Sequence, residues 1–164
     1  NLERNSLNTE NNQANLSAFR KISGIDFYGA DLNERGVRPV SQSQCEQICS
    51  KNPKCVLYSF IKEKSWCFPK HDVGQPIENS KIQSGLRLST LLDYTFTRLQ
   101  RVDFLGDDIG SSGIRNVSLF ECETLCLDNK NCKAYTYLRD KNWCFAKTGR
   151  GEFTENPRAV SGYK

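Results

Sequence analysis

The sequence has no methionine and only one histidine, His71, in 164 residues. Catalysis by a serine or cysteine nucleophile usually needs a histidine that other groups hold in place. His71 follows Lys70 in a polar stretch, so we expect it to be exposed and uninvolved in such chemistry. A glycine-rich phosphate-binding loop and a cluster of metal ligands are also missing. The sequence therefore predicts a protein that is not an enzyme and needs no cofactor or metal.

Long apolar runs and runs of like charge are missing as well. No stretch of about 18 apolar residues exists, so no transmembrane segment is expected. The net charge is only +4 and no run of Lys and Arg reaches five residues, which argues against a nucleic-acid-binding arm. A weakly basic face for acidic glycans or protein surfaces stays open. Because the chain starts at Asn1, we expect a mature product or a piece of a longer parent chain.

What the sequence does contain is an internal repeat. Residues 26–87 match 103–164 without insertion or deletion, a shift of 77 residues. The repeated features are four cysteines spaced C-x3-C-x5-C-x11-C and the motifs D-F-x-G-x-D, G-x-R-x-V-S and W-C-F-x-K. Two copies of one module are therefore predicted, at 23–87 and 100–164. Since each copy carries its own four cysteines, we expect each to fold by itself.

The segments outside the repeat differ in character. Residues 1–22 form a polar N-terminal extension rich in Asn, Gln, Ser and Glu, and we expect its first part to be flexible. Residues 88–99 are more apolar and lack Gly and Pro. This connector is therefore expected to pack on a module or between the two.

A short helix is expected in each copy. Ser41 opens it, and Gln44 follows three residues later to complete a capping box. Ser118 and Glu121 repeat this arrangement in the second copy. The first helix is expected to end near Asn52.

A β-hairpin is expected after each helix. Aromatic residues alternate with other residues in the first strand, a polar turn follows, and Trp-Cys-Phe forms the return strand. Short flanking strands would complete a small antiparallel sheet, which gives an α+β fold class. In the first copy these strands are expected around 26–27, 55–60, 66–68 and 82–86.

The eight cysteines are expected to form disulfides. Cys45 and Cys49 share one face of the helix; a short connector lets Cys49 meet Cys55, and Cys45 can then reach Cys67 on the return strand. The alternative is a zinc site, which is disfavoured because such sites use closely spaced pairs on tight turns. Disulfides imply an extracellular or periplasmic location. The predicted pairs are Cys45–Cys67, Cys49–Cys55, Cys122–Cys144 and Cys126–Cys132.

The capped helix with C-x3-C, followed by C-x-x-[YF]-x-[FY] and W-C-F-x-K, resembles the PAN/apple domain family. The leading D-F-x-G-x-D motif is also similar. The likeness is greatest to short four-cysteine modules of bacterial proteins, which occur beside caspase-like peptidase domains and in alpha-2-macroglobulin-like proteins. The resemblance implies a curved antiparallel sheet around one helix, and binding to proteins or carbohydrates.

The resemblance leaves two functions open. The chain is either a tandem recognition module for a protein or glycan ligand, or a regulatory or targeting segment of a larger exported protease inhibitor or peptidase. Four repeated cations are candidates for ligand binding, because they could grip a carboxylate, a sulfate or glycan hydroxyls. The alternative is that they bond to local carbonyls or cover an aromatic ring. These candidates are Arg38, Arg115, Lys70 and Lys147.

Two further repeated residue types have a structural explanation. Trp66 and Trp143 could stack on a sugar, but a tryptophan beside a cystine on a central strand is more often part of the core. Asp31 and Asp108 could serve as catalytic carboxylates, but each lies near a glycine-bearing turn. We therefore expect these aspartates to hold backbone turns.

Overall fold

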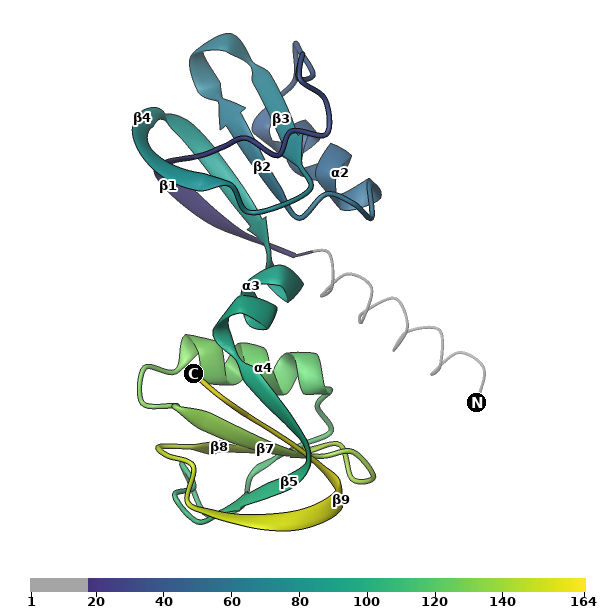
Figure 1. Ribbon diagram of the computed structural model, residues 1–164, viewed down its shortest axis with the longest axis vertical. Coiled ribbons are helices and arrows are strands. Elements are labelled where there is room, and N and C mark those ends of the chain that lie inside the picture. Colours follow the sequence, from purple (N-terminus) through teal and green to yellow (C-terminus); the bar gives the residue numbers. More distant parts are fainter. Residues whose placement is uncertain (1–17) are drawn as a thin grey trace. The chain divides into compact units, whose positions relative to one another are not determined.

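The computed structural model describes residues 18–164. The predicted N-terminal extension lies outside the described residues as far as residue 17. The chain divides after Thr90 into two compact units. In each unit a helix packs against an antiparallel sheet, which is the predicted α+β fold (Figure 1). No helix among the described residues is long and apolar enough to cross a membrane.

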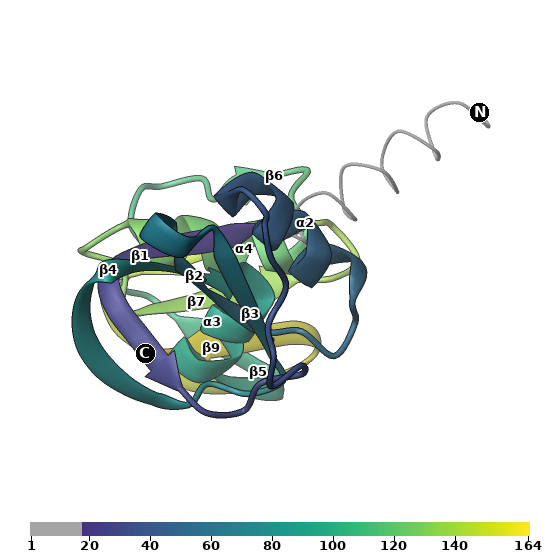
Figure 2. The same cartoon turned by 90° about the horizontal axis from the view of Figure 1, so that it is seen from above.

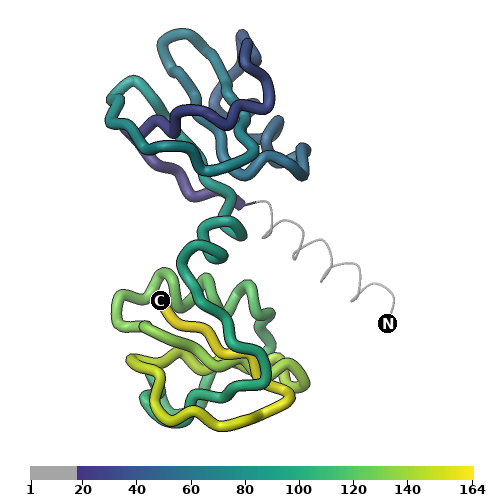
Figure 3. The backbone as a smooth tube through the Cα atoms, viewed as in Figure 1, coloured from purple at the N-terminus to yellow at the C-terminus, as the bar shows by residue number. Residues whose placement is uncertain are grey.

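The first unit contains a four-stranded sheet in the order β1-β4-β2-β3. The backbone trace shows β1 and β4 running side by side as a long ribbon (Figure 3), and both strands curve (Figure 2). Its elements are β1 (Phe19–Tyr28), α2 (Gln42–Lys51), β2 (Leu57–Ile61), the short 3-10 helix η1 (Lys62–Lys64), β3 (Trp66–Lys70) and β4 (Gln75–Arg87).

The second unit repeats this design in a five-stranded sheet of order β5-β9-β7-β8-β6. The additional strand is β6, which is two residues long and pairs with β8. The elements of this unit are β5 (Thr97–Leu105), β6 (Ile114–Arg115), α4 (Leu119–Asp128), β7 (Ala134–Leu138), β8 (Trp143–Lys147) and β9 (Glu152–Tyr163).

The segment expected as a connector, 88–99, contains regular structure. Helix α3 (Leu88–Thr95) follows β4 without a break, and β5 then begins at Thr97. Leu88 and Leu92 are four residues apart and both are buried, so the helix has one apolar face. The first strand also begins earlier than the expected module start at 23, because β1 already pairs with β4 at Phe19.

Local sequence accounts for the start of the helices. The Ser41 hydroxyl accepts a hydrogen bond from the backbone N–H of Gln44 (3.1 Å), and the Gln44 side chain accepts one from the backbone N–H of Ser41 (2.8 Å). Ser118 and Glu121 form the same capping box at the start of α4. A cap of this kind satisfies backbone donors that the first helical turn leaves unpaired.

Two disulfides attach each helix to its surroundings. The structure joins Cys45 to Cys67 on β3, with Cα atoms 5.5 Å apart, and Cys49 to Cys55 in the loop after the helix, at 5.1 Å. All eight sulfurs are used, so the cysteines are not available as zinc ligands. The second unit contains the equivalent pairs Cys122–Cys144 and Cys126–Cys132.

A cation at or directly after the end of the final strand of each unit reaches back to the helix. The Arg87 guanidinium donates to the carbonyls of Cys49 (2.8 Å) and Cys55 (2.9 Å). Lys164, at the equivalent position, donates to the carbonyl of Cys126 (2.8 Å). Carbonyls at the C-terminal end of a helix lack intrahelical donors and attract positive charge. These cations therefore stabilise the C-terminal turn of each helix.

A buried tyrosine fills the space between helix and sheet in each unit. Tyr58 is fully buried, and its ring lies directly over Gly85 on the neighbouring strand. A Cβ atom on Gly85 would lie 2.2 Å from the Tyr58 ring, and one on Gly162 would lie 2.4 Å from the ring of Tyr135. The repeated glycine in both copies is therefore a requirement of packing.

We expect Gly85→Ala to lower the free energy of unfolding of the first unit by about 3 kcal/mol, because the buried ring of Tyr58 must move. Gly24→Ala is the control: a Cβ there meets nothing within 4 Å, and Arg101 occupies the equivalent backbone conformation in the second unit. This control should cost about 1 kcal/mol. Urea unfolding followed by circular dichroism measures both, and equal losses would contradict the packing argument.

Candidate functional site

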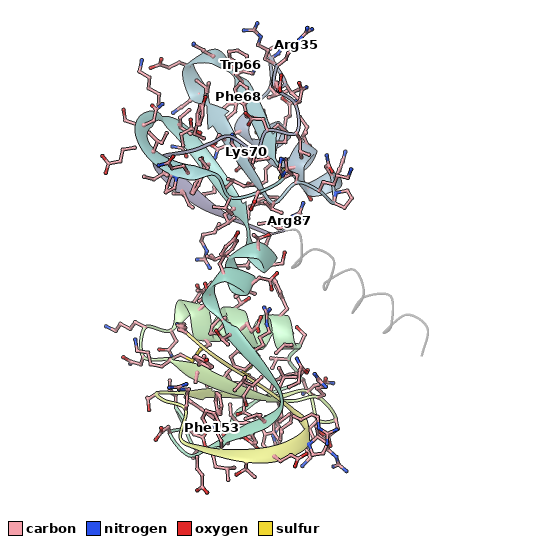
Figure 4. All side chains as sticks on the ribbon, in the orientation of Figure 1. Arg35, Trp66, Phe68, Lys70, Arg87 and Phe153 are labelled. Carbon is pink, nitrogen blue, oxygen red and sulfur yellow. A yellow bond between two sulfur atoms is a disulfide. The ribbon has the colours of Figure 1, made fainter. Side chains whose placement is uncertain are left out.

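The sheet face turned away from the helix carries the repeated Trp-Cys-Phe-x-Lys motif. Side chains alternate along a strand, and Cys67 points to the helix through its disulfide. Trp66, Phe68 and Lys70 therefore lie on the opposite face of β3 (Figure 4). The rings of Trp66 and Phe68 are in contact, with centroids 4.9 Å apart.

Two cations lie over the tryptophan in each unit. The Arg38 guanidinium carbon is 4.3 Å from the centre of the Trp66 ring, and the Lys64 ammonium is 6.0 Å from it. The indole N–H donates to the carbonyl of Arg35 (2.9 Å), which fixes the ring. We name this arrangement the Arg–Trp–Lys cluster. The second unit forms the same cluster from Arg115 (4.4 Å), Trp143 and Lys141 (5.8 Å).

The cations of the clusters are exposed and have no ion pair. Among residues 18–164, no carboxylate lies within 4.0 Å of Arg38 or Lys64, nor of Arg115 or Lys141. Both arginines therefore cover an aromatic ring, which was the alternative left open by the sequence. Both arginines remain exposed residues while they cover the ring.

The two candidate lysines are in a different position from the arginines. Lys70 is only 3% exposed, and its ammonium donates to Asp31 (2.5 Å) and to the carbonyl of Gly29 (3.1 Å). Lys147 is paired with Asp108 in the same way, also at 2.5 Å. Both lysines tie a loop to the sheet and do not reach the outer surface. The two aspartates were expected to hold backbone turns; in the structure their carboxylates accept from the ammonium groups of these lysines.

A small pocket opens beside this ion pair in each unit. In the first unit its volume is about 200 Å³, and in the second about 160 Å³. Phe68 contacts Trp66 and lines the pocket, so the pocket and the Arg–Trp–Lys cluster adjoin on one face. The sequence contained this signal only in part: it predicted the return strand and named Lys70 as a candidate, but not the loop that encloses the pocket.

A helix stapled by two disulfides to an antiparallel sheet, built twice from one repeated sequence, defines a tandem of small disulfide-stabilised modules. Family models described as the PAN domain match residues 25–72 and 93–163. The chain therefore consists of two PAN/apple domains. This family is generally non-enzymatic and commonly mediates binding to proteins or carbohydrates.

Among solved structures, the chain is similar to the two N-terminal apple domains of Toxoplasma gondii microneme protein 4. The two share 18% sequence identity and a TM-score of 0.38. The similarity covers 90% of this chain and 89% of that chain.

The side chains that could support catalysis or metal binding lie apart from one another in the described part of the chain. His71 is exposed, and its backbone N–H bonds to the carbonyl of Ala30 (2.9 Å). No group of three or more His, Cys, Asp or Glu side chains in the described part of the chain is arranged to hold a metal ion. The repeated polar groups that converge in both units are those of the Arg–Trp–Lys cluster and of the adjoining pocket.

Proposed function

We propose that the chain is a non-catalytic recognition segment, and that each module binds an acidic protein or glycan through its Arg–Trp–Lys cluster. The observation that supports this proposal is that the same pair of exposed, unpaired cations stands over the same tryptophan twice. The fold itself would need only the indole ring and its hydrogen bond to a loop carbonyl. It would not need the two cations above the ring.

The geometry of the cluster suits a carboxylate or sulfate. An arginine stacked on an indole keeps one orientation, so less conformational entropy is lost when it binds. Its planar N–H groups match the two oxygens of a carboxylate or sulfate. Lys64 and Lys141 add a second positive charge beside each guanidinium group. Arg38 and Arg115 are therefore the proposed anchoring residues.

We further propose that the recognition segment belongs to a larger exported protein, extracellular or periplasmic. Four disulfides support this, because such bonds persist in oxidising compartments. The resemblance to modules of alpha-2-macroglobulin-like inhibitors and peptidases makes a targeting role in such a protein the specific form of this proposal. The full-length gene tests it: a cytosolic protein with no export signal would contradict it.

Binding to two anionic probes, heparin and poly-glutamate, tests the role of the clusters. We expect Arg38→Gln and Arg115→Gln each to weaken binding to the preferred probe about tenfold at its own module, since a hydrogen-bonded charge is lost. The doubly substituted chain should elute from the immobilised probe at lower salt than either single variant. Lys54→Gln removes the same charge from the opposite end of the hairpin and should elute almost unchanged.

The two probes separate a glycan partner from a protein partner. Retention on heparin alone assigns a sulfated glycan, and retention on poly-glutamate alone assigns an acidic protein surface. If Arg38→Gln and Lys54→Gln weakened binding equally, net charge alone would explain the effect. That result would overturn the proposal. Retention on neither probe would overturn it as well.

A further inference from the structure

An exposed asparagine lies between β6 and α4 of the second module. Asn116 is followed by Val117 and Ser118, and the triplet Asn-x-Ser, with x other than proline, is the acceptor pattern for N-linked glycans. Asn116 is exposed and has a φ angle of 59°. A bulky group on such a residue does not have to displace the core of the module.

The fold itself does not require an asparagine at this position. Asparagine tolerates a positive φ better than most residues, so backbone conformation alone could explain Asn116. The equivalent residue of the first module is Pro39, whose ring restricts φ to about −65°. The first module therefore builds the same connection without a positive φ. Within residues 18–164 the acceptor triplet occurs only in the second module.

Asn116 stands beside both cations of the second Arg–Trp–Lys cluster. Arg115 directly precedes it, and the Arg115 guanidinium carbon lies 4.4 Å from the centre of the tryptophan ring. On the other side, the backbone N–H of Val117 donates to the carbonyl of Asn142 (3.2 Å). Asn142 follows Lys141, the second cation of the cluster. A group attached to Asn116 therefore starts one residue from one cation and beside the turn that carries the other.

From this placement we propose that Asn116 is an N-glycosylation site, and that its glycan covers the second Arg–Trp–Lys cluster. The first cluster has no acceptor residue beside it and stays free. Glycosylation would thus convert a chain with two binding modules into a chain that binds through the first module alone. Attachment of the glycan is independent of the proposed function, and only its consequence for binding rests on that function.

The transfer needs a lipid-diphosphate-linked oligosaccharide and takes place as the unfolded chain enters an export pathway. The side-chain nitrogen Nδ2 of Asn116 forms a bond to C1 of the first sugar, and the bond from C1 to the diphosphate oxygen breaks. The lipid diphosphate leaves, and the nitrogen loses one proton. The Ser118 hydroxyl, which accepts from the backbone N–H of Glu121 in the folded protein (3.2 Å), is still free at that stage.

The first measurement is the intact mass of the full chain after secretion from a eukaryotic cell line that makes uncharged oligomannose glycans. Asn15→Gln is the background, because a second acceptor triplet begins at Asn15, outside the described residues. We expect the mass of one glycan. Peptide-N-glycosidase should remove it and convert the modified asparagine to aspartate, which marks position 116 in a peptide map.

Three variants test the acceptor triplet. Asn116→Gln should remove the glycan. Ser118→Thr should keep it, because either hydroxyl completes the triplet and threonine also caps a helix. Pro39→Asn is the matched gain, since it creates the same triplet before the first helix. It should add a second glycan beside the first cluster.

The second measurement is elution from whichever probe, heparin or poly-glutamate, retains the unglycosylated chain. The glycan should weaken binding at the second module about tenfold, as Arg115→Gln does in the Asn116→Gln background, because the same contact is lost. Trimming the glycan to one N-acetylglucosamine with endoglycosidase H should restore the elution of Asn116→Gln. Pro39→Asn should elute at lower salt than the chain with one glycan, since both clusters are then covered.

The reaction of the arginines with phenylglyoxal separates this inference from the proposed function. Peptide masses taken during the reaction give the rate at each arginine. The glycan should slow the reaction of Arg115 and leave that of Arg38 unchanged, even if neither probe binds the chain.

Three results would overturn the inference. The first is that Asn116 leaves the cell unmodified. The second is a glycan that changes neither the salt of elution nor the reaction rate of Arg115. The third is that trimming the glycan fails to restore elution, because the bulk of the glycan would then not be the cause.

Discussion

Reduction of the disulfides is expected to unfold both modules in buffer without denaturant. The reason is the small contact between helix and sheet: the buried residues of α2 are Cys45 and Cys49, so sulfur makes most of its attachment to the core. In α4 the buried residues are Cys122, Cys126 and one glutamate. A helix of ten residues with so little apolar surface does not persist once its covalent links are cut.

The magnitude follows from the loops that the disulfides close. Cys45 and Cys67 are 22 residues apart, whereas Cys49 and Cys55 are 6 apart. In the chain-entropy model these bonds contribute about 3 and about 2 kcal/mol. Their combined loss of about 5 kcal/mol is comparable with the total stability of a domain of roughly 70 residues, about 4–10 kcal/mol.

Paired substitutions separate the two bonds. Removing the longer link with Cys45→Ala and Cys67→Ala should destabilise the first module by about 1 kcal/mol more than removing the shorter one with Cys49→Ala and Cys55→Ala. The second module serves as the unaltered reference in the same chain. Intact mass confirms the bonds that remain, and urea unfolding gives the free energies. A reduced chain that keeps its unfolding midpoint would contradict the role of the disulfides.

Much of this fold could be predicted because its determinants are local. The capping boxes depend on residues three positions apart, and the short disulfide on residues six positions apart. The repeat then showed that each pattern occurs twice. The return strand of the hairpin, Trp66-Cys67-Phe68, was likewise predicted from adjacent residues. In these cases a short stretch of sequence contains the whole interaction.

The candidate site was less predictable because it depends on distant segments. Lys70 reads as a surface cation, yet Asp31, 39 residues earlier, folds over it and buries it. The stacking of Arg38 on Trp66 likewise joins a loop to a strand, and sequence could offer it only as one alternative. Arg87 was missed because its partners are backbone carbonyls. Every residue has such a carbonyl, so the sequence does not show which ones Arg87 contacts.

One buried ion pair could not be found through the repeat, because only the second module has it. Glu123 is 2% exposed and accepts two hydrogen bonds from Arg98, at 2.6 and 2.8 Å, and one from the hydroxyl of Tyr135. Arg98 also donates to Asp93 (2.6 Å). Burial and the adjacent carboxylate raise the pKa of Tyr135, and the bond to Glu123 raises the pKa of Arg98. Both groups therefore remain in the forms that bond to Glu123.

The first module has a simpler version of this contact. Glu46 occupies the equivalent helical position and accepts a hydrogen bond from Tyr58 (2.9 Å). Lys21, at the position of Arg98, is exposed. Glu46 and Glu123 therefore accept a hydrogen bond from the equivalent tyrosine of their own module. Only Glu123 is also paired with an arginine.

We expect Glu123→Ala to destabilise the second module by about 3–5 kcal/mol, because it leaves Arg98 partly buried without its main partner and the Tyr135 hydroxyl without an acceptor. Glu46→Ala should cost the first module only about 1 kcal/mol, the value of one hydrogen bond. Urea unfolding of each variant, monitored by ¹H–¹⁵N spectra so that the modules are resolved, gives both values. Arg98→Ala should add little in the Glu123→Ala background, since the two residues act as one unit. Additive losses, or equal costs for the two glutamates, would show that the buried pair does not stabilise the module in this way.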